Sequence, residues 1–168
     1  MQAIRKTRGF TLVEILIVVI ILGILAAIVI PQFTNASEDA RKNSMASTLQ
    51  SLRSQLAVYK LEHSSDWPAS ADLWTQLTTK TDINGVASAD PSAKGPYFEA
   101  EVKNPITGSS TIVAGDHTAA VTANDGWVYD ATTGALHGVA KDPENPGSYM
   151  VSDDGVTKFE PADAAAAG

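Results

Sequence analysis

The chain has 168 residues, carries 12 Lys and Arg against 19 Asp and Glu for a net charge of −7, and contains no cysteine. The absence of cysteine excludes disulfide bonds, thiolate metal sites and cysteine nucleophiles. The acidic balance argues against nucleic acid as a partner, because phosphate binding requires a basic surface. The length allows one domain of ordinary size with an appendage.

An apolar segment of membrane-spanning length runs from Phe10 to Ile30, and only Thr11 and Glu14 interrupt it. As a helix it would span about 31 Å, the thickness of a bilayer's hydrocarbon core. Three basic residues precede this segment and predict that the amino terminus stays in the cytoplasm while the rest of the chain lies outside: Arg5, Lys6 and Arg8.

The helical pattern continues beyond the apolar segment to about His63. Apolar or amphipathic residues recur there mostly every three or four positions, namely at Phe33, Ala36, Ala40, Met45, Leu49, Leu52, Leu56, Tyr59 and His63. Pro31 and Gly23 predict a kink or local loosening, not a stop. We therefore expect one long helix that is hydrophobic over residues 10–30 and amphipathic over residues 31–63.

Three interpretations of this amino terminus compete: a secretory signal peptide, a plain membrane anchor, and a helix that assembles with copies of itself. The signal-peptide hypothesis would use a cleavage site near Ala36. The apolar segment is longer than the usual signal-peptide core of roughly 7–15 residues, and the helix continues past that site. This favours the other two interpretations.

Glu14 separates the two remaining interpretations, because a carboxylate inside a membrane segment is costly. In a plain anchor it would reach the headgroups and interact with the helix dipole. In an assembling helix it would have a partner from another subunit. A cut between Gly9 and Phe10 would create that partner, because the new α-amino group of Phe10 on one subunit would pair with Glu14 of a neighbour.

The segment "RGFTLVEILIVVIILGILAAIVIPQF" resembles the signature of type IV pilins and of type II secretion pseudopilins. The match consists of a basic leader, a glycine at the cut, and characteristic residues after it. The matching residues are Gly9, Phe10, Thr11, Leu12, Val13, Glu14 and Pro31. The resemblance is strong over residues 1–63. Beyond them it covers the layout, together with the stretches "GPYFEAEVKNPITGS" and "GWVYDATTG".

This resemblance implies an inner-membrane precursor with its amino terminus in the cytoplasm and its carboxyl-terminal domain in the periplasm. A prepilin peptidase would cut after Gly9 and methylate Phe10, and Glu14 would act in subunit docking. Gly23 and other small residues would let the helices approach closely in a filament core. The implied partners are copies of the chain, the peptidase, inner-membrane assembly platform proteins, and minor pilins or pseudopilins.

The exported half predicts a small antiparallel sheet, so the expected fold is α+β and pilin-like, with the long helix packed on that sheet. A short helix is expected over residues 68–80, with Ser70 as its N-cap. Strands are expected at 97–102, 110–114, 119–123, 126–130 and 135–140, the last two joined by a hairpin in which Gly134 takes positive φ. The alternating Trp127 and Tyr129 should pack on the helix.

The remaining sequence divides into a leader at residues 1–9, a globular domain at 64–160 and a low-complexity tail at 161–168. The resemblance raises a calcium site in the carboxyl-terminal loop, where oxygen ligands are available from Asp142, Glu144, Asp153 and Asp154. No cofactor is required by any motif. No catalytic motif is present, so we expect no enzyme.

The sequence therefore predicts a structural subunit of a type II secretion pseudopilus or of a type IV pilus-like filament. The alternative is an extracytoplasmic binding module held by an uncleaved anchor. That module would use Trp127 and Tyr129 to bind its ligand.

Overall fold

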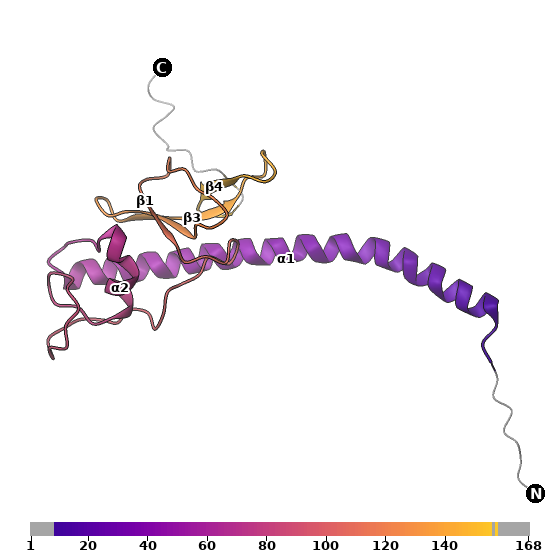
Figure 1. Cartoon of the computed structure of the whole chain (residues 1–168), viewed down its shortest axis with the longest axis horizontal. Helices are drawn as coiled ribbons and strands as arrows, with labels where there is room; N and C mark the ends of the chain where they lie inside the picture. The colour runs from indigo at the N-terminus through magenta and orange to yellow at the C-terminus, as the bar shows by residue number, and fades with distance from the viewer. Residues whose placement is uncertain (1–8, 156, 158–168) are drawn as a thin grey trace, which may run out of the picture. The chain divides into compact units, whose positions relative to one another are not determined.

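The computed structural model describes residues 9–155 and 157. The leader residues Arg5, Lys6 and Arg8 and the tail at 161–168 lie outside the described residues. The chain divides into two units, residues 1–39 and 40–168. Helix α1, Leu12–Glu62, contributes to both of them (Figure 1). The prediction of one long helix is thus confirmed, and it ends one residue before His63.

The second unit combines the carboxyl-terminal part of α1 with short elements: a 3₁₀ helix η1 (Ser70–Asp72), α2 (Leu73–Thr78), β1 (Ile112–Ala114), β2 (Trp127–Asp130), β3 (Ala135–Lys141) and β4 (Tyr149–Ser152). The strands form one sheet in the order β1-β2-β3-β4. This confirms the α+β, pilin-like class. The sheet is mixed, however, because β1 pairs parallel with β2 and only the other pairs are antiparallel. Parallel neighbours need a crossover, which residues 115–126 provide.

Two predicted strands are absent, and one observed strand was not predicted. Residues 119–123 are irregular because Asp125 accepts hydrogen bonds from the backbone and hydroxyl of Thr122, which competes with strand pairing. Residues 97–102 do not pair with the sheet, since the amides of Tyr97 and Phe98 both donate to the Leu77 carbonyl. Strand β4 lies in the stretch that was expected to be a carboxyl-terminal loop with candidate calcium ligands.

The predicted helix at 68–80 is shorter and starts differently. It forms as η1 followed by α2, and Ser70 is the first residue of η1, not its N-cap. Neither helix has a side-chain capping bond at its start. The two buried residues of α2, Leu73 and Leu77, fix its orientation by packing into the core.

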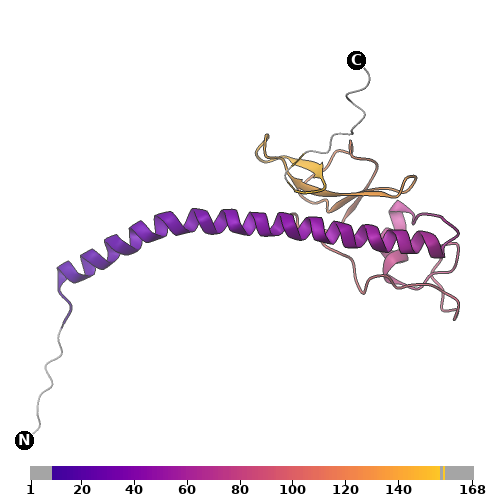
Figure 2. The same cartoon turned by 180° about the vertical axis from the view of Figure 1, so that it is seen from behind.

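One face of the sheet packs on α1 over the residues that belong to the second unit. Figures 1 and 2 show the sheet along one side of this part of the helix and α2 on another. The buried core consists of Met45, Leu49, Leu52, Leu56, Tyr59, Leu73, Leu77, Trp127, Tyr129 and Leu136. The predicted amphipathic stripe is therefore buried from Met45 to His63, and the aromatic face of β2 packs on it as expected, but the first predicted members, Phe33, Ala36 and Ala40, are exposed.

The other face of the sheet is also covered. Val128, Val139 and Val151 form a second buried cluster, against which Val113, Ala119, Val121 and Tyr149 pack. Part of this cover comes from the crossover between β1 and β2. Both faces of β2 are therefore apolar, and Trp127, Val128 and Tyr129 are all fully buried.

Helix α1 ends in a tight turn that forces two serines into an unusual backbone conformation. The Ser65 amide donates to the Lys60 carbonyl at 2.9 Å, a bond that closes the last helical turn. Ser64 and Ser65 have φ of 56° and 70°. Glycine is the usual residue after a helix end because a side chain is strained at positive φ.

Substituting Ser64→Gly should relieve this strain and raise the free energy of unfolding by about 0.5–1 kcal/mol. Urea unfolding of the full chain in detergent, followed by the fluorescence of buried Trp127, measures the change. Ser51→Gly, on the exposed side of α1, is the matched control and should lower stability by about 0.5 kcal/mol. A loss of stability in both variants would contradict the strain at Ser64.

Candidate functional site

The start of α1 is held by reciprocal hydrogen bonds between Thr11 and Glu14. The Glu14 amide donates to Thr11 Oγ1 at 3.2 Å, while Glu14 Oε2 accepts from the Thr11 amide at 3.2 Å and from its hydroxyl at 3.1 Å. This is a capping box, in which each side chain satisfies a backbone donor that the helix leaves unpaired. Glu14 thus has a local structural role that starts the helix.

The apolar side chains that follow are exposed around the whole helix. Large hydrophobic residues from Leu12 to Ile30 are 50–83% exposed. Among the described residues, α1 is the one helix long and apolar enough to cross a membrane. A helix that is apolar all round belongs in lipid or among other helices, because exposing so much apolar surface to water is unfavourable.

The junction between Gly9 and Phe10 lies just before this helix. Both residues are outside regular secondary structure and exposed, and Phe10 is 81% exposed. A peptide bond that is exposed and outside regular secondary structure is accessible to a protease. The geometry is compatible with the predicted cut.

Gly23 and Pro31 both lie inside α1, which continues through them without a break. A Cβ atom added to Gly23 would meet nothing within 4 Å, so a bare strip of backbone faces outward there. After Pro31, the Thr34 hydroxyl donates to the Ile30 carbonyl at 3.1 Å. The prediction that neither residue stops the helix is confirmed.

Residues 4–30 match the family model described as the prokaryotic N-terminal methylation motif. A type II secretion system core protein G from Dickeya chrysanthemi is 47% identical over 60 residues, which is 36% of this chain and 39% of that protein. The type IV major pilin protein PilE1 of Neisseria gonorrhoeae is 31% identical over 109 residues, 64% of this chain and 59% of that protein. The chain is homologous to these pilus and secretion proteins. This confirms the resemblance drawn from Gly9 to Pro31.

The similarity to secretion-system proteins covers only part of the chain. The core protein G of Pectobacterium carotovorum subsp. carotovorum is 37% identical over 82 residues, 49% of this chain and 52% of that protein. The chain thus spans about half the length of such relatives. No solved structure matches it. The relatives named here are a pilin and secretion-system core proteins, not enzymes, in agreement with the prediction that the chain is not an enzyme.

The four calcium candidates do not form a common site among the described residues, where no group of three or more His, Cys, Asp or Glu side chains could hold a metal. Asp142 accepts from the amides of Glu144 and Asn145 within its own turn. Asp154 accepts from Ser152 and Thr157. Calcium binding stays an untested prediction.

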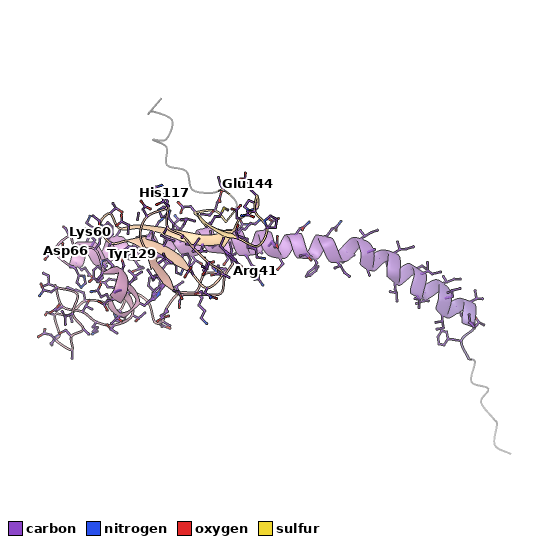
Figure 3. All side chains as sticks on the ribbon, turned by 45° about the horizontal axis from the view of Figure 1, so that its top comes forward. Arg41, Lys60, Asp66, His117, Tyr129 and Glu144 are labelled. Carbon is purple, nitrogen blue, oxygen red and sulfur yellow. The ribbon has the colours of Figure 1, made fainter. Side chains whose placement is uncertain are left out.

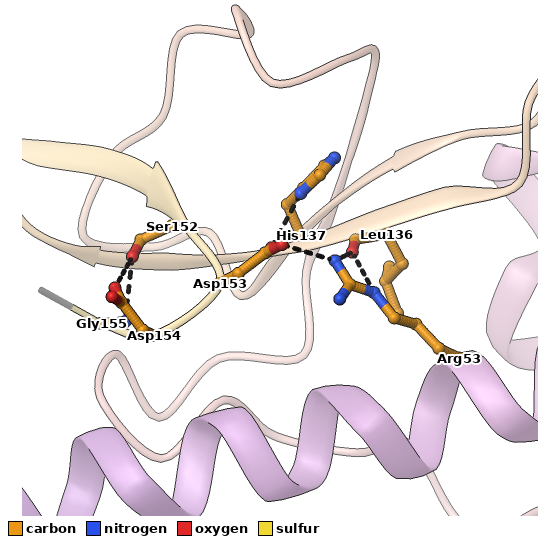
Figure 4. A network of polar contacts seen from close by, with 7 residues as sticks. All are labelled: Arg53, Leu136, His137, Ser152, Asp153, Asp154 and Gly155. Atoms are coloured by element: carbon orange, nitrogen blue, oxygen red, sulfur yellow. Dashed lines mark hydrogen bonds and ion pairs between the residues drawn. The ribbon is translucent and has the colours of Figure 1, made fainter. Parts of the chain in front are cut away.

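Asp153, the fourth candidate, instead joins an ion-pair network with α1 (Figure 4). Arg53 Nη2 lies 2.9 Å from Asp153 Oδ2, and His137 Nδ1 lies 2.8 Å from Asp153 Oδ1. Arg53 also donates through Nε and Nη2 to the Leu136 carbonyl, at 3.0 and 2.6 Å. One side chain of α1 therefore fastens both β3 and the turn after β4.

The charge of Asp153 is stabilised by these partners. Burial raises its pKa, but the hydrogen bonds from His137 and Arg53 and the Arg53 charge outweigh burial, so the pKa lies below its usual value of 3.8. Because the folded pKa is lower than the unfolded one, this stabilisation is complete above about pH 5. It is lost as the pH falls through the lowered pKa.

Other residues considered for binding are buried. Trp127 and Tyr129 are both 0% exposed. The Trp127 indole donates to the Val102 carbonyl and the Tyr129 hydroxyl to the Pro68 carbonyl. The ligand face proposed for the anchored-module alternative does not exist, because both rings belong to the core.

Sequence analysis missed the capping box and the Arg53 network. The first had a clear signal, because a threonine followed three residues later by glutamate opens an apolar run. The second had none, because Arg53 and Asp153 are 100 positions apart. Only the folded sheet brings them together.

Arg53→Met should lower the free energy of unfolding by about 1–2 kcal/mol at pH 7, since it removes donors to Leu136 and Asp153 from a partly exposed site. The loss should shrink as acid protonates Asp153. Urea unfolding of the full chain at several pH values measures both effects. Arg41→Met is the matched control: Arg41 is exposed, so the change should stay within about 0.5 kcal/mol. A pH-independent loss for Arg53→Met would contradict the ion pair.

Proposed function

We propose that this chain is the structural subunit of a type II secretion pseudopilus or of a type IV pilus-like filament. One observation carries the proposal: an exposed helix start, apolar apart from Glu14, bears the methylation motif and continues without a break into the core of a folded unit. The apolar part needs a partner surface, and a row of identical helices provides one. Such a head-to-tail contact does not close on itself and gives an open helical polymer.

The route to the filament starts in the inner membrane. The precursor spans it once, with residues 1–9 in the cytoplasm and the unit from residue 40 in the periplasm. Prepilin peptidase cuts after Gly9 and methylates Phe10. Assembly platform proteins then move the subunit into the filament, which also contains minor pilins or pseudopilins. The homology to both a pilin and secretion core proteins supports the class without choosing between them.

Glu14 acts in docking by pairing with the amino group of Phe10 on a neighbouring subunit. Within the described residues no cation lies beside its carboxylate, and its bonds are to Thr11 alone. Close approach of the helices is possible at Gly23, where the backbone is bare.

The processing step predicts a defined mass. Protein isolated from its native membranes should lack residues 1–9 and carry one additional methyl group on Phe10. Intact mass spectrometry with amino-terminal sequencing measures this. Gly9→Val, which puts a branched side chain at the cut, should leave the leader in place. Native protein that begins at Met1 in a cell with an active prepilin peptidase would support the uncleaved-anchor alternative instead.

The docking role of Glu14 can be separated from its capping role. Glu14→Gln keeps an oxygen for the capping box but removes the charge, so the protein should insert normally and filament yield should fall at least about tenfold, the equivalent of 1.4 kcal/mol lost per contact. Thr11→Val removes the capping hydroxyl and keeps the charge, so assembly should persist. Filament yield is measured by shearing and immunoblotting.

The opposite pattern, in which Glu14→Gln assembles and Thr11→Val does not, would show that helix capping is the essential role of Glu14. Processing of both variants by the peptidase serves as the internal control for membrane insertion.

A further inference from the structure

A cavity of about 510 Å³ lies beside the carboxyl end of α1, within the second unit. Its volume is within the roughly 300–1,000 Å³ typical of small-molecule sites. The wall includes Tyr59 and Lys60 from α1, Asp66 and Trp67 from the turn after it, and Asn84 from the next loop. Lys60 and Asp66 lie near one another at this end of the molecule (Figure 3). None of these residues belongs to the apolar segment of α1, residues 10–30, that is proposed for filament assembly.

Tyr59 has a free polar group at this cavity. The residue is only 2% exposed, yet its hydroxyl makes no hydrogen bond with any described residue. Its ring is fixed by stacking on His63, with centroids 3.8 Å apart and planes 5° from parallel. Burial, then Asp66 and Asp82, raise the pKa of Tyr59, so the hydroxyl is protonated at neutral pH and able to donate. No side-chain N or O atom of the described residues is both buried and without a partner, so this hydroxyl reaches the open space of the cavity, where a ligand can accept from it.

The walls around this hydroxyl are preorganised. Gln76 is held from both ends, since its Oε1 accepts from the Ala69 amide and its Nε2 donates to the Gly85 carbonyl. Trp67 lies under Lys60 Nζ, which is 4.3 Å from the ring centroid. On the hairpin, Gly134 has φ of 77°, as the sequence predicted, and a Cβ there would lie within the Trp67 ring.

The free groups are of mixed polarity. Lys60 and Asp66 contribute one charge of each sign, while the Tyr59 hydroxyl and the Asn84 side-chain amide each donate and accept. His63 contributes no free group, because Nδ1 bonds the Tyr59 carbonyl and Nε2 bonds the Thr81 hydroxyl. The adjacent helix carboxyl end disfavours anions. A charged or apolar ligand therefore fits the wall less well than a neutral polar one.

We propose that this cavity binds a neutral, polyhydroxylated ligand, a mono- or disaccharide unit. Sugar hydroxyls both donate and accept, which matches the free Tyr59 hydroxyl and the Asn84 amide, while the aromatic edges of Tyr59 and Trp67 contact the apolar C–H groups of the ring. The proposal does not depend on filament assembly, because every residue of the site belongs to the second unit.

The test is a titration of the ¹⁵N-labelled full chain in a phosphocholine detergent, which carries no sugar headgroup. The probes are glucose, galactose, N-acetylglucosamine, maltose and lactose. At least one should shift the side-chain amide signals of Asn84 and Gln76 in a saturable manner. Tyr59→Phe should weaken that probe by roughly 3- to 10-fold, the worth of one hydrogen bond, without lowering the melting temperature.

Tyr97→Phe is the matched control, because its hydroxyl donates to Glu62 Oε2 at 2.7 Å and not into the cavity. It should leave sugar affinity unchanged. Asn84→Ala is a second cavity variant and should weaken binding, since its side chain bonds no described residue. The absence of saturable shifts with all five sugars would overturn the proposal and leave the Tyr59 hydroxyl to water. Equal affinity in wild type and Tyr59→Phe would overturn it as well.

Discussion

The structure depends on a single helix that passes between two environments. An α-helix satisfies its own backbone hydrogen bonds, so it can run from lipid into a folded unit without an exposed polar break. Over Leu12 to Ile30 its apolar side chains point in every direction, whereas from Met45 onward only one stripe is buried. The same element therefore presents an exposed apolar surface at one end and forms one wall of a core at the other.

The second unit is small, and its sheet has only four short strands. It is stabilised by burial on both faces, with α1 on one and the crossover between β1 and β2 on the other. Without cysteine, the carboxyl-terminal part needs a non-covalent fastening. The bonds from Arg53 to Leu136 and Asp153 provide it, and they tie the last strand to the first helix. Asp153, which the family resemblance raised as a candidate calcium ligand, is bound by Arg53.

Periodicity predicted the long helix, the buried stripe and the aromatic face of β2, because those features depend on residues a few positions apart. Periodicity failed where the structure depends on contacts between residues that are far apart in the sequence. The parallel pairing of β1 follows from where the crossover packs, and β4 is a strand because β3 supplies its partner. At the candidate site, the methylation motif and the position of Glu14 in it were identifiable from sequence, but the contacts of Asp153 and Tyr59 required the fold. Neither set of contacts leaves a local pattern.

The capping box accounts for the hydrogen bonds of Glu14 within one subunit, but not for its negative charge. Thr11 donates two hydrogen bonds to Oε2 of the carboxylate and holds the side chain back along the helix beside Thr11. Neutral donors do not cancel its charge, and desolvating an unpaired charge is costly. Cleavage at Gly9 would add a cation of opposite sign at the same helix end. If the chain assembles as proposed, that cation on a neighbouring subunit would neutralise a carboxylate whose position the bonds to Thr11 already fix.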